Sequence, residues 1–350
     1  MRFLTQRISG VQRFAYEICV ALDGLIKKYP YITIIGLMPN SQINPQYSIN
    51  FTHFVIKKVG FLRGHLWEQI ELPIYSLGKP LLNLCNPAPM LKFDQFITLH
   101  DVIFMTGFDS QKWWFRAWYK LIAKIVSRTS KQIFTVSNFS KKEITEYLHV
   151  KPGKITVLGN ASSLINYSYD LDILDNLKIK DKQYFIIIGS NSKRKNIRMV
   201  TELFASHGFL SDYYLVVVGG DYVNLIPEHT IESNNIIYTG YISDGSIRSL
   251  YKNALALIIP SLYEGFGVPI VEALSEGIPV IASDIPVFHE VLRGLIYFDP
   301  YDRHDLLEKI KYLLICPPRA LNIKEYNTPE RLWDIYANIL LQSILENVKK

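Results

Sequence analysis

The stretch P-S-L-Y-E-G-F-G-V-P-I-V-E-A, residues 260–273, decides how the rest of this chain is interpreted. The apolar run that leads into it, residues 254–259, predicts a buried parallel strand. Residues 261–267 predict a loop, because their two glycines allow positive φ and close approach of a ligand to the backbone. Pro269 fits the first turn of a helix that ends near Gly277. Together these features predict an anion-binding corner at the carboxyl end of a parallel sheet.

Two carboxylates belong to this corner. Glu264 lies in the loop and Glu272 on the predicted helix, with seven residues between them. Carboxylates in such positions can accept hydrogen bonds from vicinal hydroxyls of a sugar. Taken singly, each glutamate is better explained as an acidic residue that stabilises a helix N-terminus. The interpretation therefore depends on the whole string.

Composition sets outer bounds on function. With 350 residues, 49% of them hydrophobic and 20% charged, the chain fits a globular protein with two domains. The net charge of +6 suits an anionic substrate or an anionic membrane surface without choosing between them. The absence of a Lys/Arg block and of any known nucleic-acid motif argues against nucleic acid as a partner.

The spacing of the cysteines and the length of the apolar runs indicate the cellular compartment in which the protein is expected. Cys19, Cys85 and Cys316 are too widely spaced to predict a disulfide framework or a zinc site. The N-terminus lacks the apolar core of a signal peptide, and no apolar run reaches the ~18 residues of a membrane-spanning helix. We expect a cytoplasmic protein, with peripheral contact at the inner face of the membrane left open.

The first half of the chain, residues 1–165, predicts a Rossmann-like domain. Ser9-Gly10-Val11 and the helical spacing of residues 12–27 follow a short strand candidate, as in a strand–turn–helix unit. His100 directly follows another strand candidate, where α/β enzymes place chemistry, although it could equally be a loop residue beside a capping Asp101. Strands are predicted at residues 1–5, 32–37, 51–57, 81–84, 95–99, 131–136 and 154–158.

Residues 111–120, Q-K-W-W-F-R-A-W-Y-K, interleave aromatic and basic side chains. Trp113, Trp114 and Trp118 could contact a membrane interface or a lipid-linked acceptor. They could also belong to an amphipathic helix that packs on the sheet and keeps its basic side chains in water. We favour the packed helix, because aromatic stripes are more often core than lipid contacts.

The second half predicts a linker at residues 166–182, a second Rossmann-like domain at 183–325 and a helical segment at 326–350. After a strand at 184–188, the consecutive cations Lys193, Arg194 and Lys195 could grip a diphosphate, although a basic loop is more often only solvated. The D-x-D string at residues 170–172 lies outside any strand-end context, so it does not predict a metal site.

The string at 260–273, followed by G-I-P-V-I-A-S-D at 277–284, resembles the EX7E motif of retaining glycosyltransferases of family 4, in particular its mannosyltransferase-like group. The resemblance extends over nearly the whole chain but is highly specific only over residues 240–284. It implies the GT-B fold, in which two Rossmann-like domains face each other across a cleft and the last helix returns to the first, acceptor-side domain.

The resemblance also implies residue roles. Glu264 contacts hydroxyls of the donor sugar, and Glu272 binds the ribose of the nucleotide. Arg194 and Lys195 neutralise the donor diphosphate. His100, in a run that matches the family's T-x-H-D, approaches the reaction centre. The remaining implied donor contacts are Gly10, Ser190, Tyr241, Ile242, Gly265, Phe266, Gly267 and Val268.

These observations predict transfer, with retention, of a hexose from a nucleoside-diphosphate sugar to a saccharide or lipid-linked saccharide in surface polysaccharide assembly. The base and sugar of the donor and the acceptor stay open, with only a slight preference for a GDP-sugar such as GDP-mannose. No metal or cofactor is expected, because the cations and the helix N-terminus can stabilise the leaving diphosphate. Two alternatives remain. A nucleotide-sugar epimerase of the same fold would need a further acid/base set, and a non-catalytic binding module would bind the donor without turnover.

Overall fold

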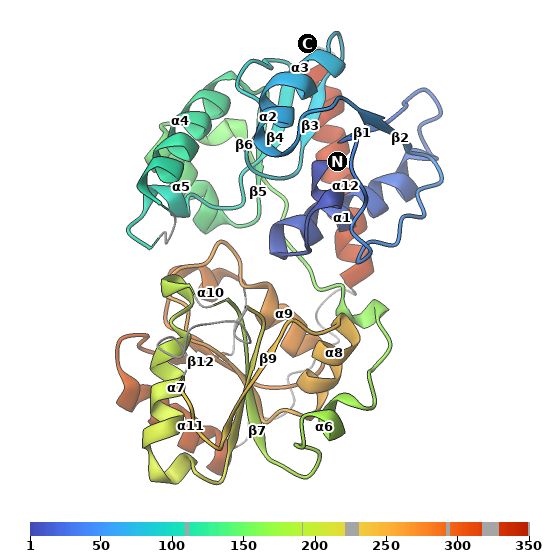
Figure 1. The fold of residues 1–350 in the computed structure, drawn as a ribbon. Helices are drawn as coiled ribbons and strands as arrows, with labels where there is room; N and C mark the ends of the chain where they lie inside the picture. The colour runs from blue at the N-terminus through green and yellow to red at the C-terminus, as the bar shows by residue number, and fades with distance from the viewer. Residues whose placement is uncertain (109–111, 191, 221–230, 292–294, 317–328, 349–350) are drawn as a thin grey trace. The chain divides into compact units, whose positions relative to one another are not determined.

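The structure, a computed structural model, describes residues 1–108, 112–190, 192–220, 231–291, 295–316 and 329–348. The chain forms two compact units, each with its own parallel sheet covered by helices (Figure 1). The first unit contains Met1–Gly107, Gln111–Asn160 and Glu330–Lys350, and the second contains Phe108–Ser110 and Ala161–Pro329. Residues 317–328, which include the predicted end of the second domain and the predicted start of the last helix, lie outside the described residues.

The second unit is built on six parallel strands in the order β12-β11-β10-β7-β8-β9. Their sequences are nearly continuous apolar runs, as expected for strands that are buried on both faces. The strands are β7 (Tyr184–Ile188), β8 (Tyr214–Val218), β9 (Ile236–Gly240), β10 (Ala256–Ile259), β11 (Val280–Ser283) and β12 (Ile296–Phe298). The predicted strand at 184–188 is confirmed residue for residue.

Helices cover both faces of this sheet. The apolar sides of α7 (Ile197–Ser206) and α11 (Arg303–Ile315) form one core with the strands. Figure 1 shows α8 (Asp244–Asn253) and α9 (Val268–Ser275) on the opposite face. The remaining helical segments are α6 (Ile173–Asn176), α10 (Pro286–Val291), η5 (Leu164–Asn166), η6 (Lys193–Lys195) and η7 (Gly208–Leu210).

The first unit has a sheet of four parallel strands in the order β3-β4-β5-β6 and a separate parallel pair, β1-β2. The strands are β1 (Ile35–Pro39), β2 (Val55–Val59), β3 (Leu81–Asn83), β4 (Gln95–Thr98), β5 (Gln132–Thr135) and β6 (Ile155–Val157). The helical segments are α1 (Gly10–Ile26), α2 (Gly64–Leu66), η2 (Trp67–Glu71), α3 (Leu72–Tyr75), α4 (Trp113–Thr129), α5 (Asn138–Leu148), α12 (Pro329–Val348), η1 (Arg2–Thr5), η3 (Ile103–Met105) and η4 (Pro152–Lys154).

The last helix packs on the first unit. Trp333 of α12 meets the ring of Phe14 in α1 edge to face, with the centroids 5.7 Å apart. Tyr336 lies against Gly159, where φ is +99° and an added Cβ would come within 2.5 Å of the tyrosine oxygen. A side chain at residue 159 would therefore be excluded both by its backbone conformation and by α12.

The predicted strand at residues 1–5 is wrong. The segment Arg2–Thr5 is a 3₁₀ helix, because its backbone groups bond within the turn and Thr5 Oγ1 donates to the carbonyl of Arg2 at 2.9 Å. Phe3 and Leu4 are buried, so apolar character alone did not distinguish the turn from a strand. Among the described residues, no helix combines the length and apolar character needed to cross a bilayer.

Candidate functional site

The strand order of the second unit brings two predicted loops together. From β7 the chain continues to β8 and β9 on one side of the sheet, and from β10 it continues to β11 and β12 on the other. Because β7 and β10 are neighbours, the loops at their carboxyl ends lie next to each other at the point where the strand order reverses, which is where open α/β sheets usually bind ligands. The β7 loop carries residues 189–196, and the β10 loop carries residues 260–267.

Direct bonds join these loops around one carboxylate. The backbone N–H of Leu262 donates to the carbonyl of Arg194 at 2.7 Å. Glu264 accepts at Oε2 from Arg194 Nη1 at 3.0 Å and at Oε1 from Lys195 Nζ at 2.5 Å. Ser261 Oγ adds a third bond to Oε1 at 2.8 Å. Both oxygens of Glu264 are therefore held, and the two predicted motifs form one cluster.

Burial and charge set the ionisation of this cluster. Burial alone would raise the pKa of Glu264, but the charges of Lys195 and Arg194 outweigh it and lower that pKa to about 2. Burial lowers the pKa of Lys195, and the carboxylate opposes this effect. Two cations then face one anion. Nε and Nη2 of Arg194 have no hydrogen-bond partner among the described residues, so the cluster keeps donors for a second anion.

The start of α9 adjoins this cluster in sequence. Gly267, its N-cap residue, has φ = +101° and makes no side-chain cap. An added Cβ at residue 267 would lie 2.7 Å from the ring of Phe288, so both the conformation and the packing require glycine here. Gly265, Phe266 and Val268 lie in the same loop and first turn, where backbone N–H groups and the helix dipole favour an anion.

The second glutamate is on α9. Glu272 is buried and accepts a hydrogen bond from Tyr251 Oη at 3.3 Å. Burial, reinforced by this carboxylate, raises the pKa of Tyr251 well above its usual range, so the phenol remains a donor. Tyr251 and Ser261 are contacts that the sequence analysis missed, and only Ser261, three residues before Glu264, had a spacing that could have indicated it.

A third buried glutamate of this unit, Glu276, makes hydrogen bonds that hold the fold together. Glu276 accepts from Arg248 Nε and from Tyr169 Oη, both at 2.7 Å. Arg248 also donates to the carbonyls of Ile165 and Tyr167. These bonds fasten the segment that the sequence analysis assigned to a linker onto the second unit. In the D-x-D string, the Asp170 carboxylate accepts from Ser246 Oγ at 2.6 Å, at the start of α8.

The other predicted donor residues of the second unit lie at carboxyl ends of strands. Ser190 follows β7 and is exposed, with its hydroxyl 3.4 Å from that of Ser192. Tyr241 and Ile242 follow β9, and about half of Tyr241 is exposed. The structure thus places them on the same edge of the sheet as Glu264.

The predicted residues of the first unit are His100 and Gly10. His100 follows β4, is buried, and has Nε2 at 3.2 Å from the carbonyl of Leu84. Burial lowers its pKa to about 4, so the imidazole is neutral at pH 7. Since a carbonyl can only accept, Nε2 carries the proton and Nδ1 is left as an acceptor. Gly10 begins α1, and a Cβ added there would meet no atom within 4 Å.

Comparisons with known proteins identify the family of this chain. The model of the family Glycosyl transferases group 1 matches residues 170–329. The O-antigen chain mannosyltransferase of Salmonella typhimurium is 32% identical over 276 residues, which cover 74% of this chain and 72% of that protein. O-antigen chain mannosyltransferase B of Escherichia coli is 33% identical over 187 residues, covering 50% of this chain and 49% of that protein.

The fold is also found among solved structures. The sucrose-phosphate synthase of Thermosynechococcus elongatus superposes with a TM-score of 0.67 at 16% identity, over 97% of this chain and 92% of that one. At this identity the similarity concerns the fold, which is the two-unit GT-B architecture. The chain therefore belongs to the group 1 glycosyltransferases and is a glycosyltransferase enzyme with the GT-B fold.

Proposed function

We propose that this enzyme transfers mannose from GDP-mannose to a saccharide or lipid-linked saccharide, with retention and without a bound metal, during assembly of an O-antigen or a related surface polysaccharide. The mannose and the O-antigen come from the names of the two relatives described above. The observation that carries the proposal is the cluster of Arg194, Lys195 and Glu264 at the carboxyl ends of the neighbouring strands β7 and β10.

In the proposed donor complex, the diphosphate meets Arg194, Lys195 and the N-terminus of α9. Positive charge placed where the leaving group becomes negative lowers the barrier without reorganisation of solvent. Glu264 and Glu272 accept hydrogen bonds from the sugar and the ribose. The backbone at Tyr241 and Ile242 holds the base, while Ser190, Gly10 and the amides of residues 265–268 complete the donor contacts.

The state of Glu264 restricts its chemical role. Its pKa of about 2 keeps it ionised at neutral pH, so it cannot supply a proton. Each of its oxygens accepts a charged hydrogen bond, which reduces its strength as a nucleophile. These features favour attack by the acceptor on the face that the diphosphate leaves, rather than a covalent glycosyl-glutamate. In this mechanism the neutral His100 contacts the sugar near the reaction centre.

The donor is identified by measuring nucleoside diphosphate release from GDP-, UDP-, dTDP- and ADP-sugars, with simple saccharides and extracted lipid as acceptors, in EDTA and in Mg²⁺. We expect acceptor-stimulated release from GDP-mannose that EDTA does not affect, and NMR of the product should show the anomeric configuration of the donor. An inverted product or a covalent intermediate detected by mass spectrometry would contradict the mechanism. Epimerisation without an acceptor, or binding without turnover, would favour the alternatives.

A further inference from the structure

The helical segment from α2 to α3, residues 64–75, buries Trp67 and Leu72 but also leaves a stripe of apolar side chains exposed. Leu66, Ile70 and Ile74, spaced four residues apart, keep 61%, 50% and 57% of their surface exposed. Its two acidic residues, Glu68 and Glu71, are buried instead. A helix on the surface of a soluble protein normally turns its apolar stripe inward and its charges outward.

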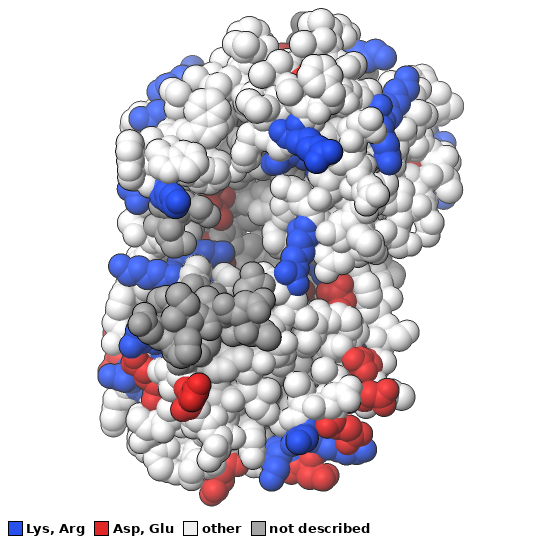
Figure 2. Space-filling model, viewed as in Figure 1, with Lys and Arg blue, Asp and Glu red and all other residues white. Residues whose placement is uncertain are grey.

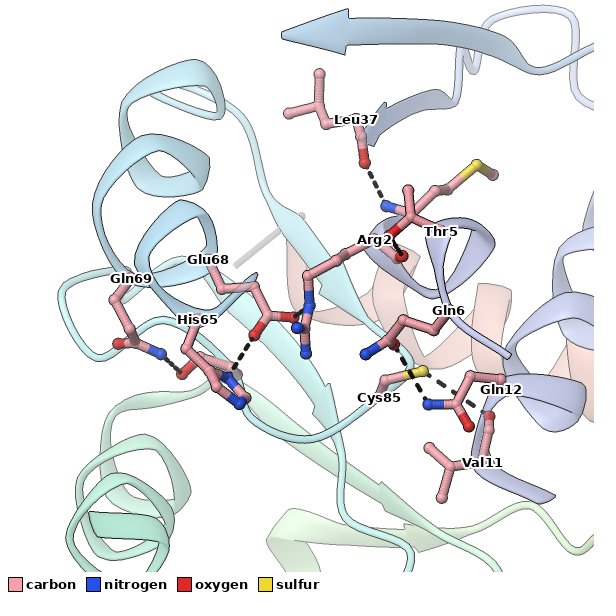
Figure 3. Close-up of polar contacts among 12 residues, drawn as sticks. Arg2, Thr5, Gln6, Val11, Gln12, Leu37, His65, Glu68, Gln69 and Cys85 are labelled. Atoms are coloured by element: carbon pink, nitrogen blue, oxygen red, sulfur yellow. Dashed lines mark hydrogen bonds and ion pairs between the residues drawn. The ribbon is translucent and has the colours of Figure 1, made fainter. Parts of the chain in front are cut away.

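Partners inside the unit hold the two acids inward. Glu68 accepts from Arg2 Nε at 2.6 Å and lies 3.3 Å from His65 Nδ1, and Figure 3 shows both side chains pointing toward it. Glu71 accepts from the backbone N–H groups of Phe61 and Leu62, both at 3.1 Å. The two acids are therefore satisfied within the unit, and the apolar side formed by Leu66, Ile70 and Ile74 is left outward.

Neighbouring residues enlarge this apolar side. Phe61, Leu77, Leu91 and Phe93 are all exposed. Lys92 lies between Leu91 and Phe93 in the sequence, and its Nζ donates to the carbonyls of Ser76 and Lys79, each at 2.7 Å. These bonds hold Leu91 and Phe93 next to the end of the helical segment. Together with Leu66, Ile70 and Ile74 they form what we call the apolar face. Isolated exposed apolar side chains are ordinary, but a grouped set on one element indicates a binding surface.

The charges around the apolar face have one sign. Of residues 55–93, all described, the exposed ones include Lys57, Lys58, Arg63 and Lys79 but no aspartate or glutamate. The cations lie at both ends of the apolar segment, so a partner of the apolar face also meets positive charge.

Helix α4 continues this pattern beside α2. The ring of His65 lies 6.2 Å from that of Phe115 and 5.9 Å from that of Tyr119. Trp113 and Trp114 are exposed, whereas Trp118 packs against the core of the unit. The sequence from residue 110 to residue 142 contains no acid, and the cations of the helix recur every four residues, at Lys112, Arg116, Lys120, Lys124 and Arg128.

We propose that the apolar face, with the first turns of α4, docks on an anionic lipid bilayer. The apolar side chains would enter the acyl boundary, the tryptophans would lie at headgroup depth, and the lysines and arginines would meet the acidic headgroups. A protein partner fits less well, because lysine is depleted in protein interfaces. A second copy would bring Lys57, Lys58, Arg63 and Lys79 near their own equivalents. The proposed docking involves the first unit alone and is independent of the proposed reaction.

The test is flotation of the full chain with phosphatidylcholine vesicles, with and without phosphatidylglycerol. We expect binding to the anionic vesicles that weakens as salt is added, and a change in the fluorescence of Trp113 and Trp114 on binding. Ile70→Glu with Ile74→Glu should lower partitioning about tenfold or more, because two apolar side chains are lost from the contact. Ile315→Glu is the control, since Ile315 is an isoleucine at the end of α11 in the second unit that is more exposed, at 79%, than Ile70 or Ile74.

Several outcomes would overturn the proposal. These are equal binding to neutral and anionic vesicles, an equal loss with Ile315→Glu, or no vesicle binding at all. A wild-type dimer that Ile70→Glu with Ile74→Glu dissociates, in the absence of vesicle binding, would assign the apolar face to a second copy. Thermal unfolding checks that the variants fold. Transfer to a water-soluble acceptor should be unchanged in them, so a failure of docking is distinguishable from a failure of the proposed function.

Discussion

The two units of this enzyme use charge in opposite ways. The first unit carries 23 lysines and arginines against 11 aspartates and glutamates, a net charge of +12. The second carries 15 against 21, a net charge of −6. Figure 2 shows the same contrast, with acidic side chains scarce over the first unit and frequent over the second. The predicted diphosphate grip nevertheless belongs to the acidic unit.

Under the proposed function, net charge and anion binding are separate properties of the two units. In the second unit two cations are fixed by bonds of 2.5–3.0 Å to one buried carboxylate, so a few oriented donors are available in spite of the unit's negative charge. In the first unit most of the described cations, apart from Arg2 and Lys92, lie at the surface and are spread over several helices and loops. An oriented site suits one small anion, whereas a spread of exposed cations suits an extended anionic surface. The chain's +6 is therefore the sum of +12 in the first unit and −6 in the second.

The largest expected effect comes from removing one cation of the oriented cluster. Lys195→Met should lower kcat/KM by ~10²-fold or more, the scale of losing one preorganised contact to the developing charge. Lys252→Met, which removes an exposed cation of α8 in the same unit, is the matched control and should change activity little. Steady-state kinetics with saturating acceptor measures both. Equal effects of the two variants would show that the unit binds the donor by general charge.

Acid should weaken the two units in different pH ranges. His100 has a pKa of about 4 in the fold against 6.5 ordinarily, so protonation of the unfolded chain removes stability as pH falls from 6.5 to 4. Glu264 has a pKa of about 2 against 4.5, so its contribution is present above pH 4.5 and is lost as pH falls toward 2. Each shift corresponds to about 3 kcal/mol of unfolding free energy.

The tryptophans can report acid unfolding of the first unit separately from that of the second. All five tryptophans, at residues 67, 113, 114, 118 and 333, belong to the first unit. Tryptophan fluorescence should therefore follow acid unfolding of the first unit, while circular dichroism follows the whole chain. His100→Gln should remove the pH dependence between 6.5 and 4 in the fluorescence signal. An unchanged dependence in that variant would contradict the assignment to His100.

The glycines at the starts of α1 and α9 should behave differently. Gly267→Ala should destabilise the enzyme by ~2 kcal/mol, because residue 267 has positive φ and the added Cβ meets Phe288. Gly10→Ala should leave the melting temperature unchanged, since a Cβ there meets nothing. If Gly10→Ala nevertheless raises KM, the space at residue 10 is used by a substrate. Thermal unfolding and kinetics on the same two variants separate packing from binding.

The smallest effect should follow removal of one exposed cation of the first unit. Lys58→Ala should weaken binding to anionic vesicles about fivefold, the usual effect of one cation near a charged bilayer. It should leave the affinity for the nucleotide sugar unchanged. A loss of donor affinity, measured by calorimetry, would mean that the spread charge of the first unit also serves the donor.

Local features of the sequence predicted much of the fold and of the site. The apolar runs at 184–188 and 254–259 marked β7 and β10, and Pro269 and Ser275 marked the extent of α9. The sequence did not determine that β7 and β10 are neighbours, because strand order depends on pairing between residues about 70 positions apart. Nor did it show that Ile70 and Ile74 face outward, since apolar residues at helical spacing normally indicate a buried side.

The most direct test of the central claim, that the Arg194–Lys195–Glu264 cluster is the donor site of a glycosyltransferase, is acceptor-stimulated release of GDP from GDP-mannose. Wild type would be compared with Glu264→Ala and with Glu308→Ala. Glu308 is an exposed glutamate of α11 paired with Lys311 at 2.9 Å, so it is the matched control. We expect a fall of ~10²-fold or more for Glu264→Ala and none for Glu308→Ala. Wild-type rates in a folded Glu264→Ala enzyme would contradict the claim.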